Sequence, residues 1–204
     1  MRLIGLLDSP YVRRVAISLA LMELPFAHEF LSVFRNYDAF AAINPVVKAP
    51  TLVADDGTTL MESTLILAYL EDLAAPERRL TPTAQADRPR AQRVIGLALA
   101  ASDKAVQLVY ERDQRPPEAR HQPWIDRVRG QMLAALGLLE GEMSDGGAWL
   151  FGPRPLQADV TTAVVWRFTQ FALPGAADPD AYPGLAALSA RAEALPEFRA
   201  APPE

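Results

Sequence analysis

The stretch Ala49–Met61, with the sequence APTLVADDGTTLM, decides the fold. Two short runs that suit β-strands flank Asp55-Asp56-Gly57, and an Asp-Gly pair in this position is typical of a tight hairpin turn. Pro50 has no backbone N–H, so it can stand only at the first residue of a strand or at an edge. The stretch therefore predicts an antiparallel β-hairpin.

The residues before this hairpin predict a strand, a helix and a second strand. Arg2–Leu7 is a short apolar run typical of a buried strand, and Phe26–Val33 alternates well enough for another. Between them, Ser9 is a good N-cap, Pro10 is a good first helical residue, and apolar residues recur at helical spacing as far as Leu24-Pro25. A connection of this length favours a parallel strand pair with a right-handed crossover.

The residues after the hairpin predict a helix from Ser63, so the first part of the chain has the order βαβ-ββα. We expect this domain to cover residues 1–76 and a proline-rich linker to cover 77–89. Residues 90–204 contain no convincing strand and predict an all-α helical bundle. Its expected helices are Arg90–Arg112, Trp124–Met143, Ala158–Phe171 and Tyr182–Leu195.

The composition of the 204 residues excludes several classes of protein. The chain has no cysteine and only two histidines, His28 and His121, so we expect no metal site, no enzyme thiolate and no disulfide chemistry. The net charge is −5 and no basic stripe is present, which argues against nucleic acid as a partner. The apolar stretch at the N-terminus is too short for a signal peptide or a membrane span, so we expect a soluble, cytoplasmic protein.

Four motifs, in this order and at this spacing, resemble those of the soluble glutathione S-transferases. They are SPYVRR at Ser9–Arg14, NPVVKAPTL at Asn44–Leu52, Glu62-Ser63, and LPEFRA at Leu195–Ala200. The resemblance covers the whole chain and is greatest to the bacterial serine-type members. It implies a thioredoxin-like N-terminal domain, a helical C-terminal domain, glutathione as co-substrate, a homodimer, and detoxification by transfer of the glutathione thiolate to small electrophiles.

One departure from the family pattern concerns a helix of the second domain. The family often carries Ser or Thr three residues before a core Asp, where it caps that helix. Here the Asp is Asp159, and Leu156 stands at the cap position. We therefore expect this helix to begin differently.

Ser9 is the catalytic candidate. A free thiol with a pKa near 8.5 is mostly protonated at neutral pH, and lowering that pKa by about two units requires about 2.7 kcal/mol. A hydroxyl hydrogen bond together with a helix N-terminus can supply this stabilisation. The alternative is that Ser9 only caps the helix. Tyr11 is a weaker candidate donor, and Arg13 and Arg14 either raise the local potential or lie solvated on the surface, as helix arginines commonly do.

By the same resemblance, Glu62 and Ser63 bind the γ-glutamyl end of glutathione. The alternative is that Ser63 caps the helix and Glu62 is a solvated acid. The resemblance also implies a cis peptide bond between Ala49 and Pro50, which turns the backbone of Ala49 toward the cysteinyl part. Lys48 either meets the glycyl carboxylate or lies in water.

The electrophile pocket is expected between the domains, with Tyr11, Asp103, Val106 and Tyr110 as lining candidates. Apolar residues there are more often core than ligand contacts. Two alternatives to conjugation stay open. One is a member of the same fold that binds glutathione or a protein without catalysis. The other is a glutathione-dependent isomerase, dehalogenase or peroxidase.

Overall fold

The computed structural model describes residues 1–143 and 147–203, and its contacts divide the chain into two compact units. The first unit is Met1–Thr81 together with Ala194–Glu204, and the second is Pro82–Glu193. The predicted C-terminal domain, 90–204, therefore differs at its end, because the residues from Ala194 onward pack with the N-terminal unit. Arg13 of the N-terminal unit contacts this segment through the Ala201 carbonyl and the Phe198 ring.

A four-stranded mixed sheet forms the centre of the first unit. Its strands are β1 (Arg2–Ile4), β2 (Ala27–Glu29), β3 (Thr51–Val53) and β4 (Thr59–Met61), in the order β2-β1-β3-β4. β1 pairs with β2 in parallel, and β3 pairs antiparallel with both β1 and β4. The predicted parallel pair and the predicted hairpin are both confirmed, although each strand is shorter than expected.

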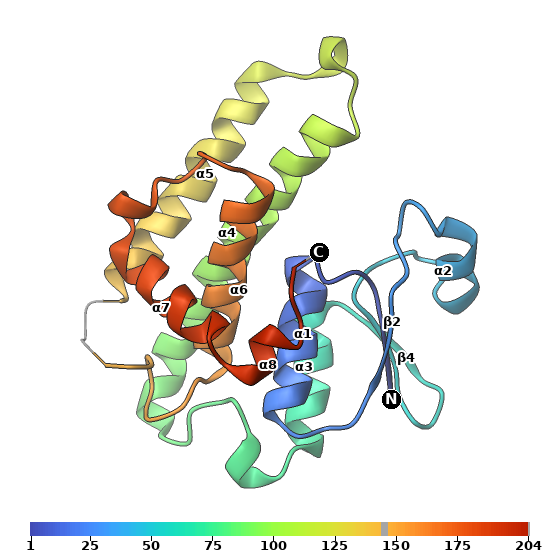
Figure 1. The fold of residues 1–204 in the computed structure, drawn as a ribbon, viewed down its shortest axis with the longest axis vertical. Helices are drawn as coiled ribbons and strands as arrows, with labels where there is room; N and C mark the ends of the chain where they lie inside the picture. Colours follow the sequence, from blue (N-terminus) through green and yellow to red (C-terminus); the bar gives the residue numbers. More distant parts are fainter. Residues whose placement is uncertain (144–146, 204) are drawn as a thin grey trace. The chain divides into compact units, whose positions relative to one another are not determined.

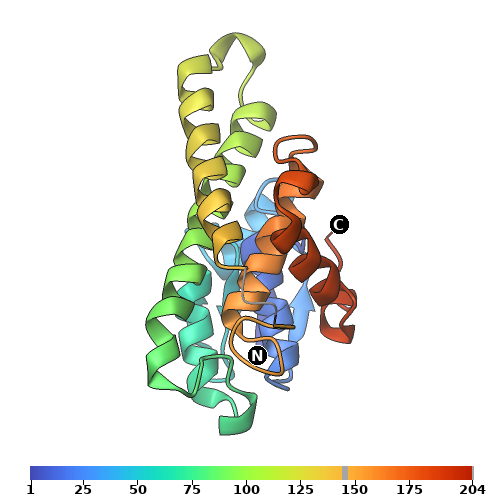
Figure 2. The ribbon, with the colours of Figure 1, turned by 90° about the vertical axis from the view of Figure 1, so that its left-hand side faces the viewer.

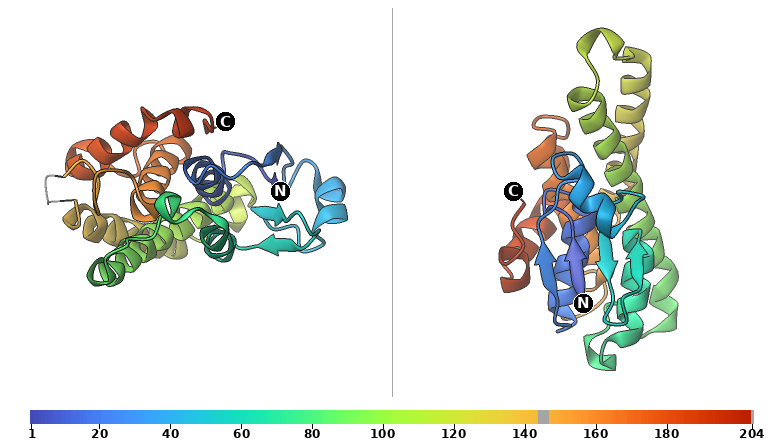
Figure 3. Two further views of the ribbon diagram at one scale, coloured as in Figure 1. Left: turned by 90° about the horizontal axis from the view of Figure 1, so that it is seen from below. Right: turned by 90° about the vertical axis from the view of Figure 1, so that its right-hand side faces the viewer.

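Helices cover both sides of this sheet. α1 (Pro10–Leu21) and α3 (Ser63–Leu73) pack together on one side, and the short helix α2 (Tyr37–Ile43) lies on the other (Figure 1; Figure 3). α2 was not predicted, because it has only seven residues, no side-chain cap and a single buried residue, Phe40. The short helices η1 (Pro76–Arg78) and α8 (Pro196–Arg199) complete the unit, which has the predicted thioredoxin-like arrangement.

The described part of the second unit consists of helices. Its long helices are α4 (Arg88–Asp113), α5 (Gln122–Gly141), α6 (Gln157–Ala172) and α7 (Pro183–Glu193), and its short ones are η2 (Gln85–Asp87), η3 (Pro117–Ala119) and η4 (Pro179–Ala181). α4 runs beside α5 and also packs against α6, which packs against α7 (Figure 2). One face of α5 contributes to the core: Met132, Leu136 and Leu139 are fully buried, Val128 nearly so, and Ile125 is half-buried.

The start of α6 shows what the departure at Leu156 changes. Asp159 is fully buried, and its carboxylate accepts hydrogen bonds from the backbone N–H groups of Leu156 (2.9 Å) and Leu150 (2.8 Å). Leu156 has no side-chain oxygen to return a bond to the helix. The helix still begins at Gln157. The hydrogen bond from the Leu156 N–H to the Asp159 carboxylate is kept, whereas the bond that a Ser or Thr hydroxyl at position 156 would make to the helix backbone is missing.

In the described residues, no helix is both long and apolar enough to cross a membrane.

Candidate functional site

Ser9 stands at the N-terminus of α1, and its hydroxyl oxygen accepts a hydrogen bond from the Val12 N–H at 3.4 Å. Its role as helix cap is thus confirmed, although this distance is long for an N–H···O bond. The bond uses only an oxygen lone pair, so the hydroxyl hydrogen remains able to donate to a ligand. The helix dipole favours negative charge at this end of α1.

A close approach of three segments brings Ala49 to the start of α1. Gly5, directly after β1, has φ +139°, and a Cβ atom there would lie 2.6 Å from Val12 Cγ2 and 3.2 Å from Ala49 Cβ. Only glycine fits both the conformation and the space. His28, which had no predicted role, forms a 2.8 Å hydrogen bond with the Gly5 carbonyl and so helps to hold the same loop.

The segment that carries Ala49 is held by a buried polar cluster. Asn44 Nδ2 donates to Thr51 Oγ1 at 2.8 Å, Thr51 Oγ1 donates to the Lys48 carbonyl at 2.7 Å, and Asn44 Oδ1 accepts from the Val46 N–H at 3.1 Å. The Ala49–Pro50 peptide bond is cis, as the resemblance implies. Neither backbone polar group of Ala49 makes a hydrogen bond within the described residues, so both are available to a ligand.

The side chain of Lys48 is exposed and makes no ion pair with any described residue. Its proposed contact with a glycyl carboxylate stays a prediction.

Glu62, rather than Ser63, caps α3. Its carboxylate accepts hydrogen bonds from the backbone N–H groups of Thr64 (3.1 and 3.2 Å) and Leu65 (3.2 Å). Its backbone has φ +73°, which L residues rarely adopt. Ser63 is the first residue of the helix and only 2% exposed. The alternative in which Ser63 is the cap and Glu62 a solvated acid is therefore wrong.

The alternative in which Arg13 and Arg14 lie solvated on the surface is also wrong, because they are only 2% and 1% exposed. Arg13 binds the C-terminal segment: its Nε donates to the Ala201 carbonyl at 2.7 Å, and its guanidinium lies 5.7 Å from the centre of the Phe198 ring. Arg14 instead donates to Ser63 Oγ at 3.5 Å. A signal was present in the sequence, since from Val12 to Leu21 every residue of α1 other than the two arginines and Ser18 is apolar, and such a helix is buried on most sides.

Three of the predicted pocket residues lie on α4, in the second unit, whereas Tyr11 lies in α1. Asp103 is exposed, pairs with Lys104 Nζ at 3.0 Å and accepts from Gln107 Nε2 at 2.9 Å. Val106 packs against the helical core, as the alternative reading of apolar residues proposed, and Tyr110 is 46% exposed. The common pocket stays a prediction.

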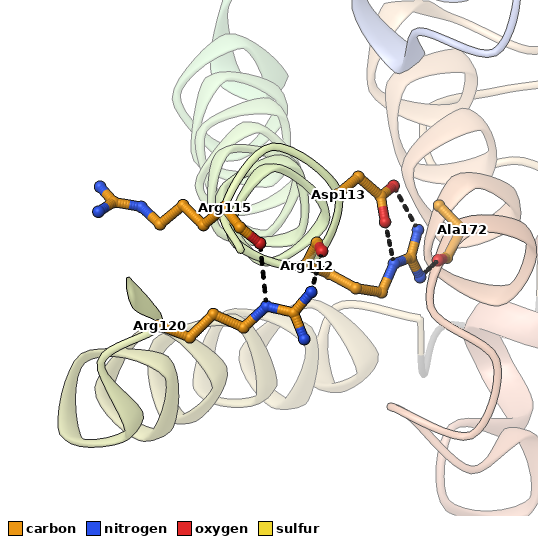
Figure 4. A network of polar contacts seen from close by, with 5 residues as sticks. All are labelled: Arg112, Asp113, Arg115, Arg120 and Ala172. Carbon is orange, nitrogen blue, oxygen red and sulfur yellow. Dashed lines mark hydrogen bonds and ion pairs between the residues drawn. The ribbon is translucent and has the colours of Figure 1, made fainter. Parts of the chain in front are cut away.

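A polar network fixes the end of α4 that carries Tyr110. Arg112 pairs with Asp113 and donates to the Ala172 carbonyl at the end of α6, while Arg120 donates to the carbonyls of Arg112 and Arg115 (Figure 4). Sequence reasoning missed this network because carbonyl acceptors leave no mark in side-chain patterns.

Within residues 1–143 and 147–203, no cluster of three or more His, Asp or Glu side chains is arranged to hold a metal ion.

Sequence comparisons match both units. The family model described as "Glutathione S-transferase, N-terminal domain" matches residues 3–78, and the one described as "Glutathione S-transferase, C-terminal domain" matches residues 122–191. The chain is also 30% identical over 199 residues to a maleylacetoacetate isomerase of Pseudomonas aeruginosa, which covers 93% of this chain and 90% of that protein.

Solved structures agree with these matches. A glutathione S-transferase from Methylobacterium radiotolerans, crystallised with glutathione sulfonate, is 31% identical with a TM-score of 0.90 and covers 98% of this chain and 93% of its own. A maleylacetoacetate isomerase from Methylobacterium extorquens, with bound malonate and glutathione, is 26% identical with a TM-score of 0.76 and covers 100% and 96% of the two chains.

Proposed function

Because the chain belongs to the glutathione S-transferase superfamily, we propose that it binds glutathione in its first unit and transfers the glutathione thiolate to small electrophiles. The observation that carries this proposal is the close approach of Ala49 and Val12 beside Gly5, because Val12 lies in the first turn of α1, which Ser9 caps. It joins a hydroxyl donor at a helix N-terminus to a backbone segment with free hydrogen-bonding groups.

In this proposal each residue of the site contacts one part of glutathione. The Ser9 hydroxyl donates to the thiolate, which favours the anion together with the dipole of α1. Ala49 pairs through its backbone with the cysteinyl part, in the manner of an added strand. Glu62 and Ser63 bind the γ-glutamyl end, and Lys48 meets the glycyl carboxylate. The rare backbone conformation of Glu62 supports this placement, because strain is often retained where function requires it.

In the conjugation reaction, the sulfur lone pair forms a bond to the electrophilic carbon. The leaving group departs with its bonding electrons, and the thiol proton passes to solvent. The chain supplies no thiol of its own, so the reacting sulfur must come from glutathione.

The experiment that tests this function is calorimetric titration with glutathione, combined with ultraviolet difference spectra of the bound thiolate from about pH 5 to pH 9. Binding with a thiol pKa below the free value supports the proposal. Binding with an unshifted pKa favours a non-catalytic binder, and absence of binding contradicts the proposal.

A second candidate is a glutathione-dependent isomerase, and the relatives named maleylacetoacetate isomerase favour it. Isomerisation regenerates glutathione, whereas conjugation consumes one molecule in each turnover. Incubation with maleylacetoacetate, while free thiol and product are both measured, separates the two. Product formation at constant thiol identifies an isomerase.

The family resemblance also leads us to propose a homodimer. Sedimentation equilibrium of the purified chain tests this, and a mass near 22.3 kDa at all concentrations would contradict it.

A further inference from the structure

Arg14 is a buried cation whose hydrogen-bonding groups are incompletely used. It is 1% exposed, its single hydrogen bond to a described residue is the 3.5 Å contact with Ser63 Oγ, and its Nε atom has no partner within the described chain. Arg13, the preceding residue, is buried to nearly the same extent but donates to two backbone carbonyls and covers an aromatic ring. The two arginines are therefore similarly buried but differ in the number of their hydrogen-bond partners.

The positive charge of Arg14 persists at neutral pH. Burial lowers the pKa of Arg14 to about 10, and the nearby Glu62 opposes this change. A buried charge without a close ion-pair partner destabilises the folded state, because water no longer solvates it. A ligand that brings an anion to Arg14 would remove part of this cost.

The start of α3 leaves donors for such an anion. The Glu62 carboxylate already occupies the N–H groups of Thr64 and Leu65, but no described group uses the N–H of Ser63. Ser63 Oγ accepts from Arg14, so its own hydrogen can point elsewhere. Ser63 thus has two donors that no described group uses, at a helix N-terminus and on a residue whose Oγ lies 3.5 Å from Arg14 Nη1.

The charges at this place match a particular kind of ligand. An anion alone would be attracted by Arg14 and repelled by the Glu62 carboxylate. A group that carries a carboxylate and an ammonium on one carbon satisfies both, since the ammonium can pair with Glu62. The free α-amino acid end of a γ-glutamyl peptide has this arrangement.

We propose that Arg14 is a positioning residue that acts through Ser63 to select ligands with a free α-carboxylate on the γ-glutamyl group. This inference rests on the proposed function, because it assumes that glutathione binds here. It assigns Arg14 a specificity role rather than a contact with the reacting sulfur.

The test compares glutathione with 4-aminobutanoyl-cysteinylglycine, which lacks only the α-carboxylate. The measured quantity is the affinity ratio of the two peptides, obtained by calorimetry for the wild type and for Arg14→Met. We expect Arg14→Met to weaken glutathione binding about tenfold or more and to leave binding of the shorter peptide unchanged. We also expect the ligand-free variant to keep or raise its melting temperature, because a buried charge has been removed.

Arg13→Met is the matched control, since it removes an equally buried arginine from the same helix. It should lower the melting temperature and leave the affinity ratio unchanged. If Arg14→Met does not fold, Arg14→Lys is used. Its affinity for glutathione relative to the shorter peptide should fall severalfold, because the planar donor group is lost.

An unchanged ratio in the Arg14 variant that folds would overturn the proposal, as would equal loss of affinity for both peptides. If the wild type binds neither peptide, the proposed function fails and this inference fails with it. If the wild type binds both equally, only the inference fails.

Discussion

At the scale of single residues, Ser9 combines two hydrogen-bonding roles in one hydroxyl group. Its oxygen caps α1 through the Val12 N–H, and its hydrogen remains for the proposed thiolate. A cap contributes stability whether or not ligand is present, whereas a donor to the thiolate affects only the bound state. The two roles therefore predict separable effects.

Ser9→Ala should lower turnover about 10- to 100-fold near neutral pH, because a hydrogen bond to a charged acceptor is worth about 1.5–3 kcal/mol. The pKa of the bound thiol should rise by about one to two units, as the same free energy requires. Loss of the cap should cost about 1 kcal/mol of stability. Difference spectra and urea unfolding measure the two effects, and a stability loss with an unshifted thiol pKa would reduce Ser9 to a cap.

The buried arginines show which residue-level features the sequence reveals. Ser9 was recognisable because Ser-Pro before a helical repeat is a local signal. For Arg13 and Arg14 the sequence leaves a raised local potential and a solvated surface position both open, because it gives no sign of their partners. The partners of Arg13, Phe198 and Ala201, lie more than 180 residues away, and no periodicity can indicate such a contact.

At the scale of elements, the segment before β3 depends on Thr51. This residue is fully buried, and its hydroxyl links Asn44 to the Lys48 carbonyl. The segment carries Ala49 and Pro50, so the geometry of the proposed cysteinyl subsite depends on a hydroxyl that touches no ligand.

Thr51→Val should lower the free energy of unfolding by about 1–3 kcal/mol, because it leaves buried polar groups without partners. It should also weaken glutathione binding. Thr59→Val, at an exposed position of the neighbouring strand β4, is the matched control and should change stability by less than about 0.5 kcal/mol. Equal effects of the two substitutions in urea unfolding would show that the cluster is unimportant.

The end of α5 is joined to α4 by an ion-pair cluster. Glu142 accepts hydrogen bonds from Arg93 Nε (2.9 Å) and Arg90 Nε (3.1 Å), and its side chain is 17% exposed. Hydrogen bonds from Arg93 and then Arg90 lower the pKa of Glu142, although burial acts against them. The folded state therefore releases this proton more readily than the unfolded state does.

Because folding lowers the pKa of Glu142, the stabilisation by Glu142 is present above its ordinary pKa and is lost as pH falls through the lowered value. Glu142→Gln should reduce stability at pH 7 by less than about 1 kcal/mol, because both arginines are partly exposed. It should also flatten the acid side of the stability profile below about pH 4.5. Glu118→Gln, at an exposed position, is the control, and identical acid profiles for wild type and Glu142→Gln would contradict the assignment.

At the scale of the whole molecule, the order of helices and strands could be predicted from the sequence. Which unit the last residues of the chain belong to could not. The hairpin and the crossover follow from local signals at Asp56-Gly57 and Ser9-Pro10, and all four long helices of the second unit follow from periodicity. The short helix at Tyr37–Ile43 lacks such signals. The return of the residues after Ala194 to the first unit depends on packing around Phe198, which only the folded chain displays.

This return makes the stability of the first unit depend on residues at the far end of the chain. Phe198 is fully buried, and Phe198→Ala should cost about 3–5 kcal/mol. Because Phe198 packs with Arg13 on α1, the loss should appear in the first unit, as faster amide hydrogen exchange in β1, β3 and α1. Mass spectrometry of peptic fragments measures this directly.

Tryptophan fluorescence provides an independent measure, because Trp124, Trp149 and Trp166 all lie in the second unit. In Phe198→Ala, the midpoint of the fluorescence transition in urea should shift less than the midpoint for exchange in the sheet. Phe171→Ala, at a position that is 43% exposed in the second unit, is the control and should leave exchange in β1 unchanged. If Phe198→Ala instead accelerates exchange first in α4 and α5, the C-terminal segment stabilises the second unit rather than the first.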